Sequence, residues 1–325
     1  MPNRSIAVAL PVVIALAMLA PLWLGDYAVE IGFRLLILFC LCEAWNLLAG
    51  YGGLVSLGSG AFVGLGGYVL VGFLNHVNAN IALAMVAAAV GCGLFAALAA
   101  PAMFRMRGLY FTVGSLALGE GLRLFMVNSA YFGGAMGLFF RADPPEMRVL
   151  YLYAFAIFVI VEILQSALTS SRFSLLLRAI RDDEGAAAQI GVAAFRIKFV
   201  AFVGTSALMG AVGGLSAMRL GAIEPYGMFS VNWSMNVALA SIIGGLGYRL
   251  GAIVGAVTVT AMSEALSDYP QVNLALTGLL LIVIVRLAPS GICGLTAKWL
   301  AGSRLAPARS VAEQPLPSEK RHVSA

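Results

Sequence analysis

The sequence predicts an all-α membrane protein, a polytopic bundle of about ten transmembrane helices that includes broken or re-entrant Gly-rich segments. The 325 residues have a mean hydropathy of +0.94. Of these residues 61% are hydrophobic and only 11% are charged, a balance that cannot cover the surface of a soluble domain. Apolar runs follow one another almost without interruption from residue 5 to residue 288. We therefore expect one transmembrane domain over residues 1–300.

The apolar runs predict the number and order of the spans. A bilayer core about 30 Å thick requires about 20 helical residues. The runs on this scale are 5–24, 29–49, 59–75, 81–103, 109–128, 149–169, 197–218, 231–247, 250–266 and 272–288. The first run follows Arg4 and exceeds the ~7–15 apolar residues of a secretory signal, so we expect a retained helix rather than a cleaved one. Residues 301–325 are rich in Pro, Ser and charge and are expected to form a disordered cytoplasmic tail.

The basic residues predict which helix ends face the cytoplasm. With both termini inside, the Lys and Arg residues on the outer side are only Arg34, Arg123, Arg141, Arg148 and Arg219, out of 20 in the chain. An inner excess of this kind follows the positive-inside rule. The basic residues are scattered between apolar runs without interleaved aromatics, which argues against nucleic acid as a partner. The four Cys and two His lack metal-ligand spacing, so we expect no metal site and no disulfide framework.

The stretch GYGGLVSLGSGAFVGLGGY, residues 50–68, is unusually rich in Gly. Its spacing fits neither a dinucleotide fingerprint nor a P-loop, so we expect no nucleotide site of these kinds. Small residues four apart let transmembrane helices pack closely. The pairs with this spacing that we expect at helix contacts are Gly60/Gly64, Gly210/Gly214 and Gly247/Gly251. The alternative is a broken or re-entrant helix near the midplane, with unwound backbone facing a small solute; a second Gly-rich break lies at 244–255.

Polar side chains within the spans are candidates to line a path across the membrane, because a polar group in hydrocarbon must face a partner or a polar interior. The candidates are Asn46, Ser56, Ser59, Thr112, Ser115, Glu120 and Asn236. Two interpretations of Glu120 are open. It lies three residues before Arg123 and would pair with it on one helix face, or it would belong to a proton relay. The acids in the spans form no evident chain, which favours the pair.

The most polar stretch, LLLRAIRDDEGAAAQIGVAAFRIK, covers residues 175–198 between two predicted spans. Ile180, Ala187 and Ile190 recur at helical spacing, which predicts one short amphipathic helix at the inner membrane surface. Gly191 would end this helix. Two interpretations are open: a solvated helix held by lipid headgroups, or a helix that docks on another protein through its acidic cluster and its three consecutive Ala residues.

Several stretches together resemble the inner-membrane permease subunits of bacterial ABC importers for branched-chain amino acids. They run in order through nearly the whole chain: AWNLLAGYGGLVSLGSGAFVGLGGY (44–68), GLYFTVGSLALGEGLRLFMVN (108–128), GGAMGL (133–138), LLRAIRDDEGAAAQIGV (176–192) and IIGGLGYRLGAIVGA (242–256). The most specific pieces are YFTVGSLALGEGLR and RAIRDDEGAAAQIGV. Both look like the M-type member of the permease pair.

The resemblance implies a transport subunit that performs no chemical step and holds no cofactor. It implies an inner-membrane protein with a second permease subunit, two cytoplasmic ABC ATPases that bind the ATP, and a periplasmic solute-binding protein as partners. The polar stretch, about residues 172–196, corresponds to the cytoplasmic coupling helix that docks on the ATPase. The coupling residues implied in this way are Arg178, Arg181, Asp182, Asp183, Glu184, Ala187 and Gly191.

Two departures from the family pattern bear on the transported solute. Ser59 stands where many relatives have His, and GGAMGL at 133–138 replaces a more polar sequence. The solute therefore stays open among branched-chain amino acids, similar amino acids, and urea or amides. A rival function is a secondary transporter driven by ions through the buried acids. Robust ion-driven uptake in vesicles that lack an ATPase would favour this rival.

Overall fold

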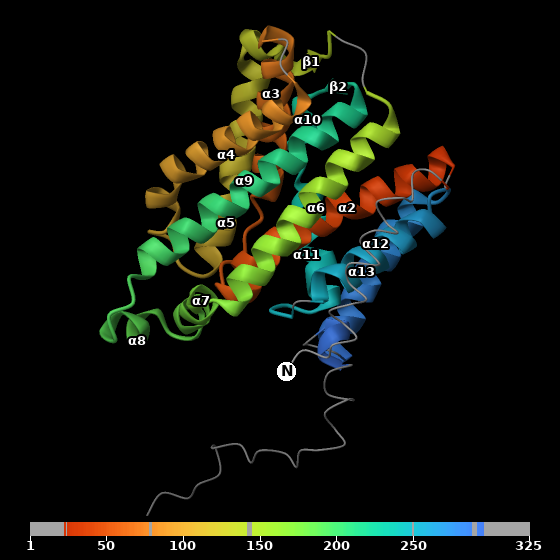
Figure 1. Cartoon of the computed structure of the whole chain (residues 1–325). Coiled ribbons are helices and arrows are strands. Elements are labelled where there is room, and N and C mark those ends of the chain that lie inside the picture. The colour runs from red at the N-terminus through yellow and green to blue at the C-terminus, as the bar shows by residue number, and fades with distance from the viewer. Residues whose placement is uncertain are drawn as a thin grey trace, which may run out of the picture.

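The computed structural model describes Trp23 and residues 25–77, 80–141, 145–248, 250–287 and 291–295. Apart from Trp23, the predicted span 5–24 lies outside the described residues, and so does the predicted tail 301–325. Long helices lie side by side and short elements join their ends (Figure 1). The predicted all-α bundle is thus confirmed.

Each of the other predicted spans coincides with a helix. These helices are α2 (Asp26–Asn46), α3 (Ser59–Val77), α4 (Ile81–Met103), α5 (Leu109–Asn128), α6 (Met147–Ser170), α9 (Ala194–Leu220), α11 (Val231–Gly244), α12 (Gly251–Ala265) and α13 (Pro270–Leu287). Among the described residues, five helices are long and apolar enough to cross a membrane: α2 with its π-helical continuation η1 (Leu47–Tyr51), α3, α4, α6 and α9. Helices α11 and α12 have only 14 and 15 residues. The multi-pass character is therefore established, and the total of ten spans stays a prediction.

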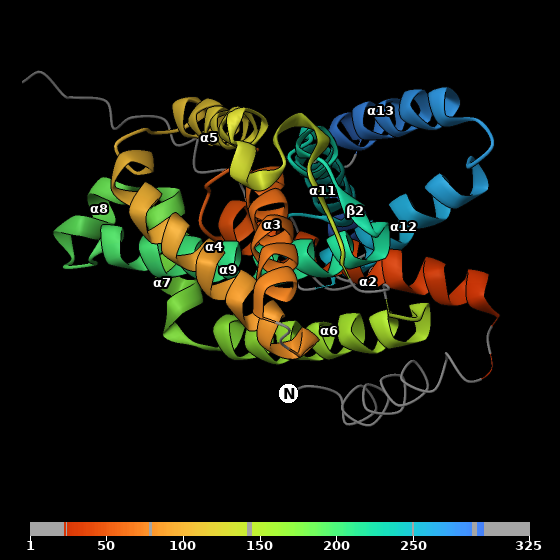
Figure 2. The same cartoon turned by 90° about the horizontal axis from the view of Figure 1, so that it is seen from above.

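Helices α2 and α9 form the interior of the bundle. Helix α9 packs along α3 and α4, and α2 packs against α6, α9, α11 and α12. Helices α5 and α6 lie on opposite sides, with α3 and α9 between them (Figure 2). Helix α4 exposes an apolar stripe at helical spacing, made of Leu83, Val86, Val90, Leu94 and Leu98. Such a stripe suits contact with lipid chains.

The close approach of α3 and α9 depends on glycine. A Cβ atom at Gly66 would lie 2.0 Å from the carbonyl oxygen of Gly210, and one at Gly213 would lie 2.2 Å from that of Val63. No real side chain fits at such distances, so the two backbones touch directly. Small residues at a membrane helix contact permit this geometry.

Short elements occupy the two ends of the bundle. At one end, α7 (Arg172–Asp182) and α8 (Glu184–Gln189) connect α6 to α9; we call this the α7–α8 end. At the other end, β1 (Leu138–Phe139) pairs antiparallel with β2 (Ala222–Ile223), and we call this the strand end (Figure 1). The connections near it include η2 (Ala130–Phe132), η3 (Gly134–Met136) and α10 (Pro225–Met228).

Candidate functional site

The polar stretch forms two helices, so the prediction of one amphipathic helix was wrong. Asp183 has φ −155° and ψ 109°, an extended conformation that separates α7 from α8. Its Oδ1 accepts a hydrogen bond from the amide of Ala186 at 3.0 Å and so caps α8. Of the residues predicted on the apolar face, Ile180 and Ala187 are buried, whereas Ile190 is exposed. The N-capping preference of Asp outweighs the helical periodicity at this position.

Two arginines of α7 contact η1, the π-helical end of α2. Nη1 of Arg181 donates to the carbonyl oxygen of Gly50 at 2.7 Å. The guanidinium carbon of Arg178 lies 4.9 Å from the centre of the Tyr51 ring, a cation–π contact. Gly53, with φ +68°, lies so close that a Cβ there would be 2.6 Å from Cγ of Arg181. These contacts join the polar stretch to the first Gly-rich break, the part of the 50–68 stretch that precedes α3.

An ion pair fixes α8 to the start of α9. Nζ of Lys198 lies 2.7 Å from Oε2 of Glu184, and the Lys198 side chain is only 11% exposed. A lysine this deeply buried requires a partner. Lys198 was not among the predicted site residues; its position at the start of an apolar span was the only signal for it.

The predicted coupling residues therefore fall into two groups. Arg178, Arg181, Glu184 and Ala187 contact the rest of this chain. The outward group is Asp182, Asp183 and Gly191, all exposed, and it lies beside Ala186, Ala188 and Ile190, which are exposed as well. Ile190 is 78% exposed and lies in the connection between two predicted spans.

Three of the predicted path residues bond to the non-helical linker between η1 and α3. Oγ1 of Thr112 donates to the carbonyl oxygen of Val55 at 2.8 Å. Oγ of Ser115 accepts from the amide of Leu57 at 2.9 Å, and Oγ of Ser56 accepts from an amide two residues further on at 3.1 Å. Backbone groups at membrane depth require such internal partners. The break is therefore held by side chains of α5 and of the linker itself.

Asn46 connects the two Gly-rich breaks. Its Oδ1 accepts from the amide of Gly247 at 2.8 Å, and its Nδ2 donates to the carbonyl oxygen of Tyr248 at 3.2 Å. Asn46 is the last residue of α2, directly before η1. Ser59 begins α3, and its buried hydroxyl has no hydrogen-bond partner among the described residues.

The two remaining path candidates are Glu120, which lines a small pocket together with Leu57 and Gly60, and Asn236. Glu120 accepts from Nε of Arg123 at 2.9 Å and also pairs with Nη2, while Arg123 stacks over the Tyr226 ring at 4.9 Å. The structure therefore contains the predicted Glu120–Arg123 pair. Asn236 lines a cavity toward the strand end of the bundle. The role of the seven candidates in lining a path stays a prediction.

The six glycines predicted at helix contacts all lie against other elements. Gly210 meets Cys92 on α4, and Gly214 meets Leu70 on α3. Gly60 and Gly64 do not face α9. Gly60 packs against Ser230 and Gly64 against Phe229, both in the connection before α11. Gly247 lies beside the carbonyl of Gly50, and Gly251 against that of Gly245.

A cavity of about 390 Å³ opens between α7, α8 and the first break. Its wall includes Gly53, Arg107, Arg181, Asp183 and Lys198. The polar stretch therefore has space beside it on the side of the α4–α5 connection. Within the described part of the chain, no group of three or more His, Cys, Asp or Glu side chains could hold a metal ion.

Comparison with known proteins identifies the family. The model of one family, the permease component of branched-chain amino acid transport systems, matches residues 27–285. Similar proteins are the high-affinity branched-chain amino acid transport system permease proteins LivM of Salmonella typhimurium and Escherichia coli. Each is 27% identical to this chain, over 88% of it and 75% of the relative. The probable branched-chain amino acid transport permease protein LivH of Methanocaldococcus jannaschii is 25% identical, over 85% of this chain and 83% of its own. No solved structure matches the chain.

Proposed function

Since the chain belongs to the family of permease components of branched-chain amino acid transport systems, we propose that it moves branched-chain or similar amino acids across the bacterial inner membrane within an ATP-driven importer. Two cytoplasmic ABC ATPases bind and hydrolyse the ATP, and a periplasmic protein delivers the solute. A second, different permease subunit completes the membrane part. Ten spans place both termini and the α7–α8 end in the cytoplasm, in agreement with the distribution of basic residues.

One observation carries the proposed mechanism: α7 is bonded to the end of α2 by the Arg181–Gly50 hydrogen bond. Closure of the ATPases on ATP moves α7 and α8. Arg181 passes this movement to η1, where a π-helix already departs from regular helical geometry. Asn46 passes it on to Gly247 in the second break. The breaks then rearrange while the long helices between them stay rigid.

The outward face of α8 is the proposed contact with the ATPase. It combines exposed Ile190 with the small side chains of Ala186 and Ala188, beside Asp182, whose carboxylate pairs with Arg181 at 3.1 Å. Helices that dock in a groove of another protein place apolar side chains into it. Lipid headgroups would favour basic residues on this face instead.

Reconstitution tests the function. The chain, its permease partner and the ATPases are placed in vesicles with the binding protein, and uptake of radiolabelled leucine is measured with and without ATP. We expect uptake only with ATP. Uptake that an ion gradient drives without ATPases would overturn the proposal.

A matched pair of variants tests the docking face. Ile190→Glu is expected to abolish co-purification of the ATPase, because a carboxylate replaces the apolar anchor. Val77→Glu makes the same change at the end of α3, where Val77 is 55% exposed and far from α8. It is expected to leave co-purification unchanged. Equal ATPase yields from both variants would exclude Ile190 as a contact.

A further inference from the structure

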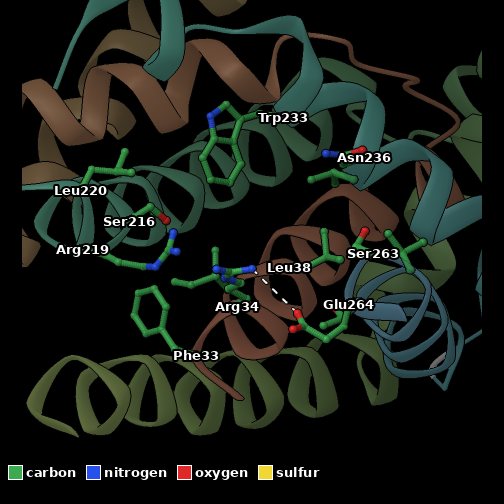
Figure 3. Close-up of a pocket in the computed structure, with 14 residues that line it drawn as sticks. Phe33, Arg34, Leu38, Ser216, Arg219, Leu220, Trp233, Asn236, Ser263 and Glu264 are labelled. Atoms are coloured by element: carbon green, nitrogen blue, oxygen red, sulfur yellow. Dashed lines mark ion pairs between the residues drawn. The ribbon is translucent and has the colours of Figure 1, made fainter. Parts of the chain in front are cut away.

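A second cavity, of about 330 Å³, lies between α2, α9, α11 and α12. Figure 3 shows Arg34, Arg219 and Glu264 on one side of it and Trp233 and Asn236 on the other. Apolar side chains form much of the remaining wall, among them the buried Phe33 and Val237. Concave sites with an apolar wall and a few converging polar groups are typical of small-molecule binding, and this volume falls within the ~300–1,000 Å³ usual for them.

The charged groups of the cavity balance one another. Glu30, adjacent to it, accepts hydrogen bonds from Nη2 of both Arg34 and Arg219 at 2.5 Å. Nη1 of Arg34 lies 3.9 Å from Oε2 of Glu264, too far for a hydrogen bond. With two guanidinium and two carboxylate groups the cluster is neutral, so it would accept a neutral or zwitterionic ligand at no net cost in charge.

Arg219 and Glu264 each have polar atoms that are available to a ligand. A guanidinium has five N–H donors, and within the described residues Arg219 uses one of them, toward Glu30. Among the described residues, Oε2 of Glu264 has only the loose contact with Arg34, while Oε1 accepts from the hydroxyl of Tyr27. One cationic and one anionic group therefore face a common space lined by apolar side chains.

The cavity belongs to the strand end of the bundle. Arg219 is in the last turn of α9, and Glu264 is in the last turn of α12. Arg34 precedes Gly50 by sixteen residues, about 24 Å along α2 and η1 at 1.5 Å per residue. If α7 and α8 are cytoplasmic, the cavity is on the periplasmic side, where solute arrives.

We infer that this cavity binds the transported amino acid as a zwitterion, an inference that rests on the proposed function. Arg219 binds the carboxylate through its remaining donors, and Glu264 accepts from the ammonium group. The aliphatic side chain lies against Phe33, Val237 and Trp233. The neutral cluster matches the zero net charge of such a ligand, whereas urea or a simple amide has neither a carboxylate for Arg219 nor an ammonium group for Glu264.

Equilibrium binding tests this assignment. The complex of both permeases and the ATPases is placed in phosphatidylglycerol nanodiscs without the binding protein, and binding of radiolabelled leucine is measured. Leucinamide, which lacks the carboxylate, and 4-methylpentanoate, which lacks the ammonium group, are competitors. We expect leucine to bind more tightly than either one.

Two variants separate the two ends of the ligand. Arg219→Gln is expected to weaken leucine binding at least tenfold, about 1.4 kcal/mol, and to abolish the preference over leucinamide only. Glu264→Gln is expected to weaken it similarly and to abolish the preference over 4-methylpentanoate only. Arg148→Gln is the matched control, because Arg148 pairs at 3.6 Å with exposed Asp26 near the start of α2. It is expected to bind leucine as the unaltered chain does.

Three outcomes would overturn the inference. The first is unchanged leucine affinity in both variants. The second is an equal loss for all three ligands while the Arg148→Gln control binds normally, which would show that neither residue distinguishes the two ends of the ligand. The third is loss of leucine binding in phosphatidylethanolamine nanodiscs, which would assign the cavity to a zwitterionic lipid headgroup. ATP-driven uptake by the unaltered complex with its binding protein tests the proposed function separately, so either one can fail alone.

Discussion

Reversing the charge of Glu184 tests whether this residue acts within the chain or on the partner. Glu184→Lys places two ammonium groups at the former 2.7 Å contact with Lys198. Exposed ion pairs contribute about 0.2–1 kcal/mol, whereas breaking a buried pair costs about 3–5 kcal/mol. Here one side chain is 11% exposed and the other 38%, so we expect a cost near 2 kcal/mol. This cost lowers the ratio of α8 packed against α9 to α8 detached from α9 by about 30-fold, at 1.4 kcal/mol per factor of ten.

The assay is solute-stimulated ATP hydrolysis in the reconstituted complex, with membrane insertion checked in the same preparation. Glu184→Lys is expected to lower the stimulated rate at least about tenfold and to leave insertion intact. The matched variant carries Glu184→Lys together with Lys198→Glu, which restores the pair with its polarity reversed, and we expect it to recover most of the stimulated rate. A double variant as inactive as the single one would refute the reasoning and indicate that Glu184 contacts the ATPase directly.

Three further changes are expected to have graded effects. Arg181→Ala removes the bond to Gly50, so leucine uptake per ATP hydrolysed should fall about tenfold, measured in proteoliposomes. Gly66→Ala forces a Cβ to within 2.0 Å of the α9 backbone and should cost at least about 1–3 kcal/mol, read as lower thermal survival in detergent; Gly72→Ala, with nothing within 4 Å, should match the unaltered chain. Ser115→Ala leaves a linker amide without its acceptor and should cost about 1–3 kcal/mol in the same assay. Its control is Ser170→Ala, because in the described part of the chain that hydroxyl bonds only within its own helix.

Element positions followed from the sequence wherever one long apolar run was bounded by turn residues. The predicted span 81–103 coincides with α4, and 109–128 coincides with α5. In these runs hydrophobic burial and helix formation favour the same boundaries. The break at Asp183 was missed because capping by one side chain competes with a periodicity that continues on both sides of it.

Contacts between residues far apart in the sequence could not be predicted, because they produce no local sequence pattern. Spacing predicted six glycines at helix contacts but overlooked Gly66 and Gly213, where α3 and α9 approach most closely. The partner of Glu184 is a lysine in the next helix. The cavity near the strand end joins Arg34 to Glu264 across most of the chain, and only the packing of α2 on α12 brings them together.

Helix α2 is the physical connection between the two proposed sites. Its first half carries Arg34 into the cavity near the strand end, and its last residue, Asn46, precedes the η1 turn that receives Arg181. From Phe39 to Tyr51 the helix and its continuation are buried without interruption, so a displacement at η1 cannot be absorbed by local bending into free space. The surrounding helices must move with α2 or slide along it. Movement of α7 by the ATPases would therefore alter the distance between Arg34 on α2 and Glu264 on α12, which is the contact that a bound ammonium group would have to enter.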